Sequence, residues 1–427
     1  MPKWLMVAGR NIGSAVTFGN TEYNTPCGFL WLAATEVRQQ YIARDSYTWA
    51  DLLVKITANT LDDTTTVKSR VDAGDGNQTV SILTTETGTF QDTINSDTLT
   101  DGELFCYEFA AGGTEGEITA AIISSTLETA SNTTPIIGCG YSHRVEGAGS
   151  TLYLHLMGGD ASGLYVGFAT EPEAQYTFRA DATLTYLRVY GGISSIAGLT
   201  FVSRINGVNG NLTISIPDNT TGAYEDAVHN DIISTGDEVN YRTVCGDASG
   251  SGRNIYLYNY QVKSNSTGRQ TASASPGLHG IDHAVTSYFA IEGDTEDTVT
   301  EADAQCLTRM AFVAKNFFVN IYINDANAAR IINTRINGGD GNLTVSITAA
   351  TSGIFEDLGN TDTLIATDLY NYKIAGAGGL GSTTVAIVGF ELQQEAPVPP
   401  VEKKPHTFRL HPRPGHRMKF EPNLKLG

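Results

Sequence analysis

The chain has 427 residues, of which 17% are charged, and a formal net charge of −19 at pH 7. This length allows about two to four domains with separate cores, and the many Thr, Asn, Ser, Asp and Gly residues favour short strands and turns over long, salt-bridged helices. The acidic balance argues against nucleic-acid binding by the folded body, because contacts with phosphates need a basic surface.

The cysteines and the apolar runs narrow the class of protein further. Five cysteines lie far apart, at positions 27, 106, 139, 245 and 306, without a C-x-x-C pair. This pattern is typical of neither a zinc site nor a disulfide framework, so we expect buried free thiols in a protein made in a reducing cytoplasm. The apolar run near the N-terminus is too short for a signal peptide, and no run is long enough to span a membrane.

In chain order, an N-terminal segment (1–24) precedes three related blocks, which we call repeats 1, 2 and 3. Their borders lie where the composition becomes polar or rich in proline. The predicted divisions are 25–130 for repeat 1, 131–149 for a linker, 150–263 for repeat 2, 264–282 for a second linker, 283–394 for repeat 3, and 395–427 for a proline-rich, basic C-terminal arm.

Each repeat is dense in strand-like segments. Runs that are apolar or alternate in polarity recur as LLVKI (52–56), LRVYG (187–191) and NFFVNIYIN (316–324). About seven to nine such segments occur in each repeat, the number expected of a sandwich or jelly roll. The sequence therefore predicts an all-β fold of three tandem jelly-roll-like β-sandwich domains with an extended C-terminal arm.

One segment fits two structures. Read alone, residues 301–318 place their apolar residues on one helical face. The aligned segments of repeats 1 and 2 alternate in the manner of strands. We follow the alignment and predict a strand.

One block of sequence occurs in all three repeats, as VDAGDGNQTVSI (71–82), INGVNGNLTISI (205–216) and INGGDGNLTVSI (336–347). An arginine precedes the turn, an asparagine closes it, and an aspartate follows downstream. These matched residues are Arg70, Arg204 and Arg335; Asn77, Asn211 and Asn342; and Asp92, Asp226 and Asp357. A second aspartate follows each of the first as Asp97, Asp231 and Asp362, and a T-E-x-x-x-Q motif upstream precedes Arg44, Arg179 and Arg309.

The glycine-rich turn could be a calcium loop or a hairpin. The copy in repeat 2 has no carboxylates, and no copy has the glutamate that ends a calcium loop. Asn-Gly and Asp-Gly between alternating strands are the strongest hairpin signal, because both residues can adopt positive φ. We therefore predict hairpins and no metal.

The repeated acids could supply paired carboxylates for glycoside hydrolysis. An enzyme needs one asymmetric group of residues in a cleft, whereas these acids recur in every repeat. We therefore predict a structural role for Asp92, Asp226 and Asp357, as turn caps or as partners of the repeated arginines. GAGGLG (376–381) precedes a strand rather than a helix, so it predicts a loop and not a nucleotide site. With no catalytic motif present, we expect no enzyme activity and no cofactor.

The arm is opposite in charge to the rest of the chain. Residues 402–427 contain seven Lys or Arg and two Glu, a charge of +5, so the preceding residues carry −24 (−19 − 5). Cations interleaved with apolar side chains favour a docking segment, and a solvated tail or a nucleic-acid tether are the alternatives. The predicted partner-binding residues are Phe408, Arg409, Leu410, Arg413, Arg417, Met418, Phe420 and Leu424.

The repeated block R-[VI]-[DN]-G-x-x-G-N-x-T-[VI]-S-I, followed by T-G-x-[FY]-E-D and G-D-x-x-N-Y, resembles a module of tailed-bacteriophage virion proteins. The match is best over 203–241, and the other repeats depart from it at Ala73, Gln91 and Thr367. The resemblance covers the three repeat cores and omits both termini. It implies a structural virion protein, such as a capsid decoration or cement subunit or a tail or fibre component, and carries over no catalytic residue.

We therefore expect a non-enzymatic virion protein, made in the host cytoplasm and located on the capsid surface, whose three modules form a pseudo-trimer. The expected partners are the major capsid protein or neighbouring copies of the chain itself, with no membrane partner. The alternative is a tail or fibre adsorption protein that binds host-surface glycans. The Tyr-rich segment NIYLYNYQV (254–262) is the hint for that alternative, although it also fits a plain strand.

Overall fold

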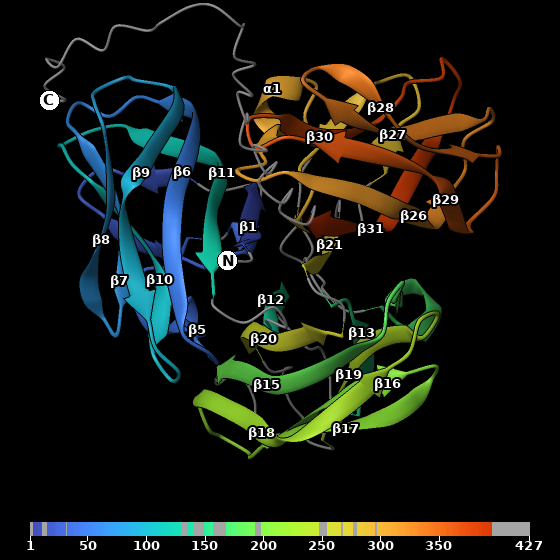
Figure 1. Ribbon diagram of the computed structural model, residues 1–427, viewed down its shortest axis with the longest axis horizontal. Helices are drawn as coiled ribbons and strands as arrows, with labels where there is room; N and C mark the ends of the chain where they lie inside the picture. The colour runs from blue at the N-terminus through green and yellow to red at the C-terminus, as the bar shows by residue number, and fades with distance from the viewer. Residues whose placement is uncertain are drawn as a thin grey trace, which may run out of the picture. The chain divides into compact units, whose positions relative to one another are not determined.

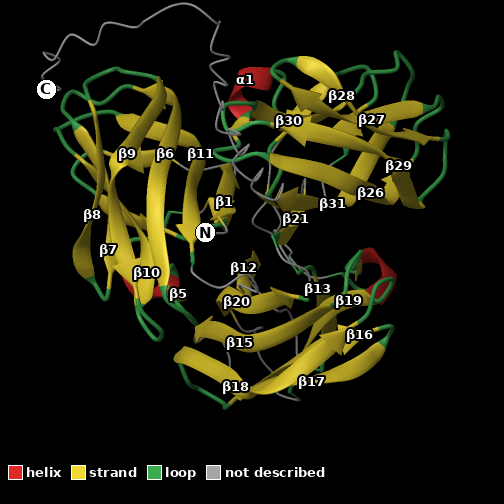
Figure 2. Ribbon diagram, in the orientation of Figure 1, coloured by secondary structure: helices red, strands yellow, loops and turns green. Residues whose placement is uncertain are grey.

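The computed structural model describes residues 3–10, 15–30, 32–129, 135–140, 149–156, 168–192, 198–246, 254–265, 268–275, 280–294 and 297–394. Strands dominate this part of the chain (Figures 1 and 2), which confirms the all-β prediction. By its contacts the chain divides into a compact unit of residues 1–395 and a second unit of residues 396–427. The arm lies outside the described residues.

Repeat 1 contains two sheets. The first has the order β4-β1-β11-β6-β9, made of β4 (Gly28–Leu30), β1 (Lys3–Arg10), β11 (Glu117–Glu128), β6 (Tyr47–Asn59) and β9 (Gly88–Leu99), with β2 (Ala15–Thr17) on β11. The second has the order β3-β10-β7-β8, made of β3 (Thr21–Asn24), β10 (Leu104–Ala111), β7 (Thr65–Val71) and β8 (Gly74–Ile82), with β5 (Tyr41–Ile42) on β10. A 3-10 turn, η1 (Glu36–Arg38), precedes β5.

Repeat 2 also has two sheets. The first has the order β12-β20-β15-β18, made of β12 (Pro135–Gly140), β20 (Asn254–Ser264), β15 (Ala182–Gly192) and β18 (Gly222–Ile233). The second has the order β13-β19-β16-β17, made of β13 (Thr151–Leu154), β19 (Glu238–Cys245), β16 (Leu199–Ile205) and β17 (Val208–Ile216). The 3-10 turn η2 (Glu171–Glu173) precedes β14 (Tyr176–Thr177), which pairs with β19.

Repeat 3 follows the same plan. Its first sheet, β24-β21-β31-β26-β29, contains β24 (Gly293–Asp294), β21 (Arg269–Ser275), β31 (Ser382–Gln394), β26 (Phe312–Asn324) and β29 (Gly353–Leu364), with β22 (Ile281–Asp282) on β31. Its second sheet, β23-β30-β27-β28, contains β23 (Ser287–Phe289), β30 (Leu369–Ile374), β27 (Arg330–Ile336) and β28 (Gly339–Ile347), with β25 (Cys306–Leu307) on β30. A short helix, α1 (Glu301–Ala304), precedes β25.

The strand order is identical in the three repeats. If the eight principal strands of a repeat are numbered along the chain, the two sheets read 1-8-3-6 and 2-7-4-5 each time. Apart from strands 4 and 5, which form a hairpin within one sheet, strands that are adjacent in sequence thus alternate between the sheets, which is the arrangement of a jelly roll. The principal strands pair antiparallel, as between β6 and β11 or β27 and β30.

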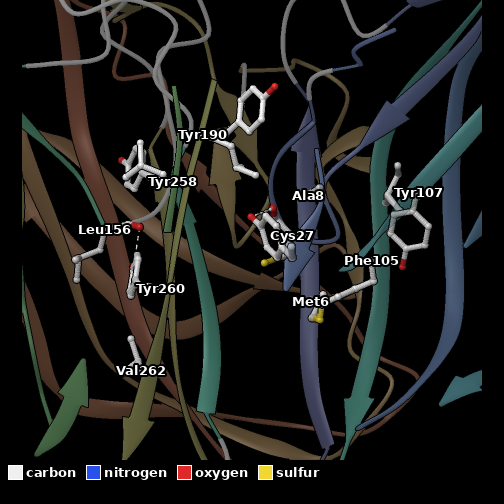
Figure 3. Close-up of a cluster of buried hydrophobic side chains, with 14 of the residues drawn as sticks. Met6, Ala8, Cys27, Phe105, Tyr107, Leu156, Tyr190, Tyr258, Tyr260 and Val262 are labelled. Carbon is white, nitrogen blue, oxygen red and sulfur yellow. Dashed lines mark hydrogen bonds between the residues drawn. The ribbon is translucent and has the colours of Figure 1, made fainter. Parts of the chain in front are cut away.

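The apolar core continues from one repeat into the next. One cluster of buried residues joins repeats 1 and 2 and includes Phe318 of repeat 3, while the other belongs to repeat 3 and includes Leu5 and Val7 of repeat 1. Figure 3 shows part of the first cluster, in which the Tyr260 hydroxyl donates a hydrogen bond to the carbonyl oxygen of Leu156 at 2.6 Å. The repeats are therefore packed against one another through apolar side chains.

The 301–318 segment forms α1 over four residues and then the strands β25 and β26, so the strand predicted from the alignment is confirmed beyond the first turn. Three segments that the sequence placed outside the repeats also supply strands to their sheets. They are 3–24 with β1, β2 and β3; 135–140 with β12; and 269–282 with β21 and β22. The reason is clear for β1, whose residues Trp4 to Ala8 are buried on both faces and so show no alternation.

Candidate functional site

The triplicated motif forms a two-residue hairpin in each repeat. The turn residues have positive φ: Asp72 (48°) and Ala73 (61°), Asn206 (50°) and Gly207 (76°), and Asn337 (52°) and Gly338 (80°). The flanking residues pair directly, as Val71 does with Gly74. Two positive φ angles in a two-residue turn match the right-handed twist of the flanking strands. The predicted hairpins are thus confirmed.

The Gly-Asn pair of the motif lies beyond the turn. The sequence placed Gly76 and Asn77 at its close, but both belong to β8, at a bulge where the register with β7 shifts between Lys68 and Arg70. A Cβ on Gly76 would lie 2.8 Å from Asp97 Oδ1 and would also collide with the Ser69 hydroxyl. The glycine is therefore needed so that a buried carboxylate can approach the backbone.

That carboxylate is the second repeated aspartate, which the sequence did not single out as a site residue. Asp97 is 3% exposed, and its Oδ1 accepts a hydrogen bond from the Asn77 amide nitrogen at 2.6 Å. Its Oδ2 accepts hydrogen bonds from the Ser69 hydroxyl and from Gln78 Nε2. Asn77 Nδ2 in turn donates to the carbonyl oxygen of Ser96 at 3.0 Å. The repeated asparagine thus ties β8 to β9.

The same contacts occur in the other repeats. The amide nitrogens of Asn211 and Asn342 each donate to a buried aspartate, Asp231 or Asp362, at 2.6 Å. The side-chain amides of these two asparagines donate to the carbonyl oxygens of Asn230 and Thr361. Three copies of one contact set indicate a structural device that each repeat requires.

The first repeated aspartate performs a related task. Asp92 Oδ2 accepts a hydrogen bond from the Thr79 amide of β8 at 2.9 Å, and Oδ1 accepts from the amides of Ile94 and Asn95 in its own strand. Burial alone would raise the pKa of Asp92, but the amide donors lower the pKa below its ordinary value. Asp92 is therefore ionised at neutral pH and is unsuited to act as a general acid.

Asp226 and Asp357 have equivalent surroundings. They accept hydrogen bonds from the Thr213 and Thr344 amides, both at 2.9 Å, and their pKa values are likewise lowered by backbone and side-chain donors against the effect of burial. The predicted structural role of these acids thus takes the form of strand capping.

The two aspartates together close the open edge of each sandwich. β8 and β9 are edge strands of the two different sheets of repeat 1. The Asn77 and Thr79 amides of β8, which pair with no further strand, donate to Asp97 and Asp92 of β9. An edge strand with unpaired amides is a template for association with another strand. The side chains remove that template within the molecule.

The repeated arginines have glutamates, not the repeated aspartates, as partners. Arg70 Nε lies 3.2 Å from Glu36 Oε1 in η1, and the Arg70 guanidinium also contacts Asp75 and the turn carbonyl of Ala73. Arg204 and Glu171 form the same pair at 2.8 Å, as do Arg335 and Glu301. Of the two roles predicted for the acids, pairing with the repeated arginines is wrong, because Asp92 and its copies accept hydrogen bonds from strand amides such as that of Thr79 in β8. The recurrence of T-E-x-x-x-Q beside that of the arginine was the signal for the true pairing.

A second set of repeated arginines joins neighbouring repeats. Arg44 of repeat 1 forms an ion pair with Glu225 of repeat 2, and Arg179 of repeat 2 forms one with Glu356 of repeat 3. Glu225 and Glu356 each stand one residue before a repeated aspartate. The two contacts therefore use equivalent surfaces on successive repeats.

Between repeats 3 and 1, the arginine is present but the matching glutamate is not. Gln91 stands in repeat 1 where the other repeats have glutamate. Burial lowers the pKa of Arg309 of repeat 3, and the charge of Asp51 in repeat 1 acts in the opposite direction. Asp51 lies at the bulge of β6, and at the matching bulge of β15 the Tyr186 ring lies 5.1 Å from the Arg44 guanidinium carbon. The charge of Asp51 at the β6 bulge thus acts on Arg309, as the Tyr186 ring at the β15 bulge lies near Arg44.

Hydrogen bonds to backbone carbonyls follow the same order of repeats. Arg188 in β15 donates to the carbonyl oxygen of Gln40 in repeat 1 at 2.6 Å. Asn320 in β26 donates to that of Pro172 in repeat 2 at 3.1 Å, and Lys55 in β6 donates to that of Ala302 in repeat 3. Repeat 2 thus binds repeat 1, repeat 3 binds repeat 2, and repeat 1 binds repeat 3, in a closed cycle in which the Asn320–Pro172 and Lys55–Ala302 contacts use equivalent positions.

The contact between repeats 1 and 3 also contains a buried carboxyl group. Gln270 of β21 accepts a hydrogen bond from the Leu5 amide at 3.1 Å and donates one to the Leu5 carbonyl oxygen at 2.6 Å. Glu292 accepts from the Val7 amide at 3.2 Å and from Gln270 at 3.0 Å. Burial raises the pKa of Glu292 to about 8, against the opposing effect of these two donors. Two side chains of repeat 3 thus bind the backbone of β1.

The other segments that the sequence suggested as sites are parts of the fold where the structure describes them. Tyr258 and Tyr260 of the Tyr-rich segment are buried in β20, and 376–381 is a loop between β30 and β31. Burial raises the pKa of the Cys306 thiol to about 12. No group of three or more His, Cys, Asp or Glu among the described residues could hold a metal ion, and none of their helices is long and apolar enough to cross a membrane. The predicted arm residues, from Phe408 to Leu424, lie outside the described residues.

Comparisons with known proteins add little. No protein family matches the chain, and no curated protein matches it. Among solved structures, one described as PNGF-II in the C2 space group has a TM-score of 0.22 and 6% sequence identity, covering 82% of this chain and 99% of that one. A likeness at this level supports no inference about fold or function.

Proposed function

We propose that the protein is a non-enzymatic structural protein of a tailed-bacteriophage virion, most simply a capsid decoration or cement protein. It would bind the outer shell as a pseudo-trimer of three related modules. The major capsid protein or neighbouring copies of the chain would be its partners, and its termini would anchor it.

The observation that carries the proposal is the closed cycle of contacts between the repeats. Arg44 with Glu225 and Arg179 with Glu356 repeat one contact, and Lys55 with Ala302 closes the cycle. One chain thereby presents three related surfaces, as a homotrimer does. Such an object suits a lattice position that is surrounded by three copies of a shell subunit.

The internal use of the repeated motif also supports attachment rather than reaction. Asp92 and its copies are ionised acceptors of backbone amides, and Arg70 and its copies are paired with glutamates. The motif that most strongly suggested an active site is therefore engaged in holding the sandwiches closed.

The test is to add the purified full chain to shells that lack it and to locate it by electron cryomicroscopy. We expect density over local threefold positions and loss of binding after deletion of 396–427. A matched control, Phe408→Ser with Leu410→Ser and Phe420→Ser, keeps all seven cations of the arm and separates apolar anchoring from charge. Binding to host glycans with no binding to shells would refute the proposal in favour of an adsorption protein.

A further inference from the structure

One end of repeat 1 gathers four connecting loops. The Phe18 amide, in the loop after β2, donates a hydrogen bond to the carbonyl oxygen of Gly116, in the loop before β11, at 3.1 Å. The Thr60 amide, in the loop after β6, donates to the carbonyl oxygen of Glu117 at the start of β11, at 2.8 Å. Asn59 Nδ2 donates to the carbonyl oxygen of Leu83 at 3.0 Å, which adds the loop between β8 and β9. We call these four loops the loop end of repeat 1.

Two large apolar side chains on this surface face solvent. Phe18 is 45% exposed and Leu83 is 55% exposed. These loops and the first residue of β11 carry five exposed carboxyl groups, those of Asp62, Asp63, Glu86, Glu115 and Glu117. A loop end that carries an aromatic anchor, an aliphatic anchor and several acids is the complement of a segment in which apolar residues alternate with cations.

The corresponding end of repeat 3 differs in charge. Two acids, Asp282 and Asp325, occur in its four loops, which are residues 280–286, 325–329, 348–352 and 375–381. Leu380 there is 77% exposed without a ring of carboxylates around it. Among the described residues, this end of repeat 1 is thus more acidic than the corresponding end of repeat 3.

We infer that the loop end of repeat 1 binds the C-terminal arm of a second copy of the chain. The arm supplies seven cations against two acids between 402 and 427, interleaved with Phe408, Leu410, Met418, Phe420 and Leu424. The loop end supplies five carboxylates together with Phe18 and Leu83. Opposite charge steers such a segment to its site, and burial of the apolar anchors holds it there.

The arm begins at the opposite end of repeat 1 from the loop end of its own chain. Gln394, at the end of β31, donates to the carbonyl oxygen of Lys3 at 2.6 Å, and Lys3 pairs with Glu128 at the far end of β11. The loop end of repeat 1 adjoins Glu117 at the opposite end of that strand. Eleven residues of strand separate the two places by about 36 Å. A head-to-tail contact between copies lets each copy provide one arm and accept another.

This inference rests on the attachment role proposed for the arm, but its test needs no virion. Failure of self-association would leave shell binding to be judged by the experiment above. The full chain is studied by sedimentation velocity at about 50 and about 500 mM salt, conditions between which screening of exposed charges increases severalfold. We expect concentration-dependent association at low salt that weakens at least tenfold at high salt.

Two variants and a mixture decide the question. Deletion of 396–427, and separately Glu115→Lys with Glu117→Lys, should each abolish association, whereas mixing the two variants should restore a 1:1 complex, because one keeps the site and the other keeps the arm. Asp218→Lys, in the loop of repeat 2 that matches the one containing Leu83, is the control for the lysine substitutions. Leu83→Ser should weaken association, whereas Leu380→Ser, which removes an exposed leucine from the corresponding end of repeat 3, should not. Thermal unfolding checks that each variant is folded.

A monomeric wild-type chain at both salt concentrations would overturn the inference, as would association that survives both variants or a mixture that fails to form the complex. A monomer would also be the result if the arm bound its own chain.

Discussion

The bulge glycine of the repeated motif should be among the least replaceable residues of the chain, and Gly341→Ala tests this directly. The new Cβ would lie 2.6 Å from Asp362 Oδ2 and would collide with the Thr334 hydroxyl. Asp362 is fully buried and accepts hydrogen bonds from Asn342 N and Tyr370 OH at 2.6 and 3.1 Å. Displacing this carboxylate weakens at least two hydrogen bonds to a buried acceptor, at about 1.5 kcal/mol each, so we expect a loss of about 3 kcal/mol in the free energy of unfolding.

Equilibrium urea unfolding, followed by circular dichroism and tryptophan fluorescence, measures this loss. Gly359→Ala in the same repeat is the matched control, because a Cβ there meets no atom within 4 Å. Ile94 and Val228 occupy the equivalent position in the other repeats, so the control should change the free energy of unfolding by less than about 0.5 kcal/mol. If Gly341→Ala proved as stable as Gly359→Ala, the glycine would not be needed for the approach of the carboxylate.

Three further predictions concern the turn, the contact between repeats and pH. Ala73→Gly should stabilise the protein by about 1 kcal/mol, since Ala73 has a φ of 61° that glycine adopts without strain, and an unchanged urea midpoint would contradict this. A double-mutant cycle with Arg44→Met and Glu225→Gln should give a coupling energy of about 0.5–1 kcal/mol for this partly exposed pair, and zero coupling would show that the ion pair does not hold repeats 1 and 2 together. Because burial raises the pKa of Glu292 from 4.5 to about 8, its stabilising effect is fully present below pH 4.5 and is lost as the pH rises towards 8. Glu292→Gln should flatten that decline in a pH series of melting temperatures, and an unchanged slope would refute the assignment.

The sequence was most informative where a pattern follows from local backbone preference. Alternating β-branched residues and Asn-Gly dipeptides predict strands and tight turns, and Asn337–Gly338 forms the turn they indicate. Gly76 was misplaced in the turn because a glycine beside an asparagine gives the same local signal in a bulge. Only the distant Asp97, twenty-one residues further on, explains why the glycine is there.

Contacts between repeats were beyond prediction from spacing alone. Arg44 and Glu225 are 181 residues apart, and nothing in their local sequence identifies one as the partner of the other. β1 was missed for a different reason. Leu5 faces repeat 3 while Trp4 faces the core of repeat 1, so neither helical nor strand periodicity remains visible. A strand that is buried on both sides by different partners loses the pattern by which strands are recognised.

The closed edges have a consequence for how such a chain can fold. Three successive copies of nearly the same hairpin emerge from one ribosome, and each could exchange a strand with its neighbour, which is a characteristic misfolding route of repeated sequences. Asp92 and Asp97 accept hydrogen bonds from the Thr79 and Asn77 amides of β8, and both lie in the strand that follows it directly in the chain. A copy that completes its own edge early offers no docking place to the next copy, so near-identical sequences can follow one another in one polypeptide and still fold separately.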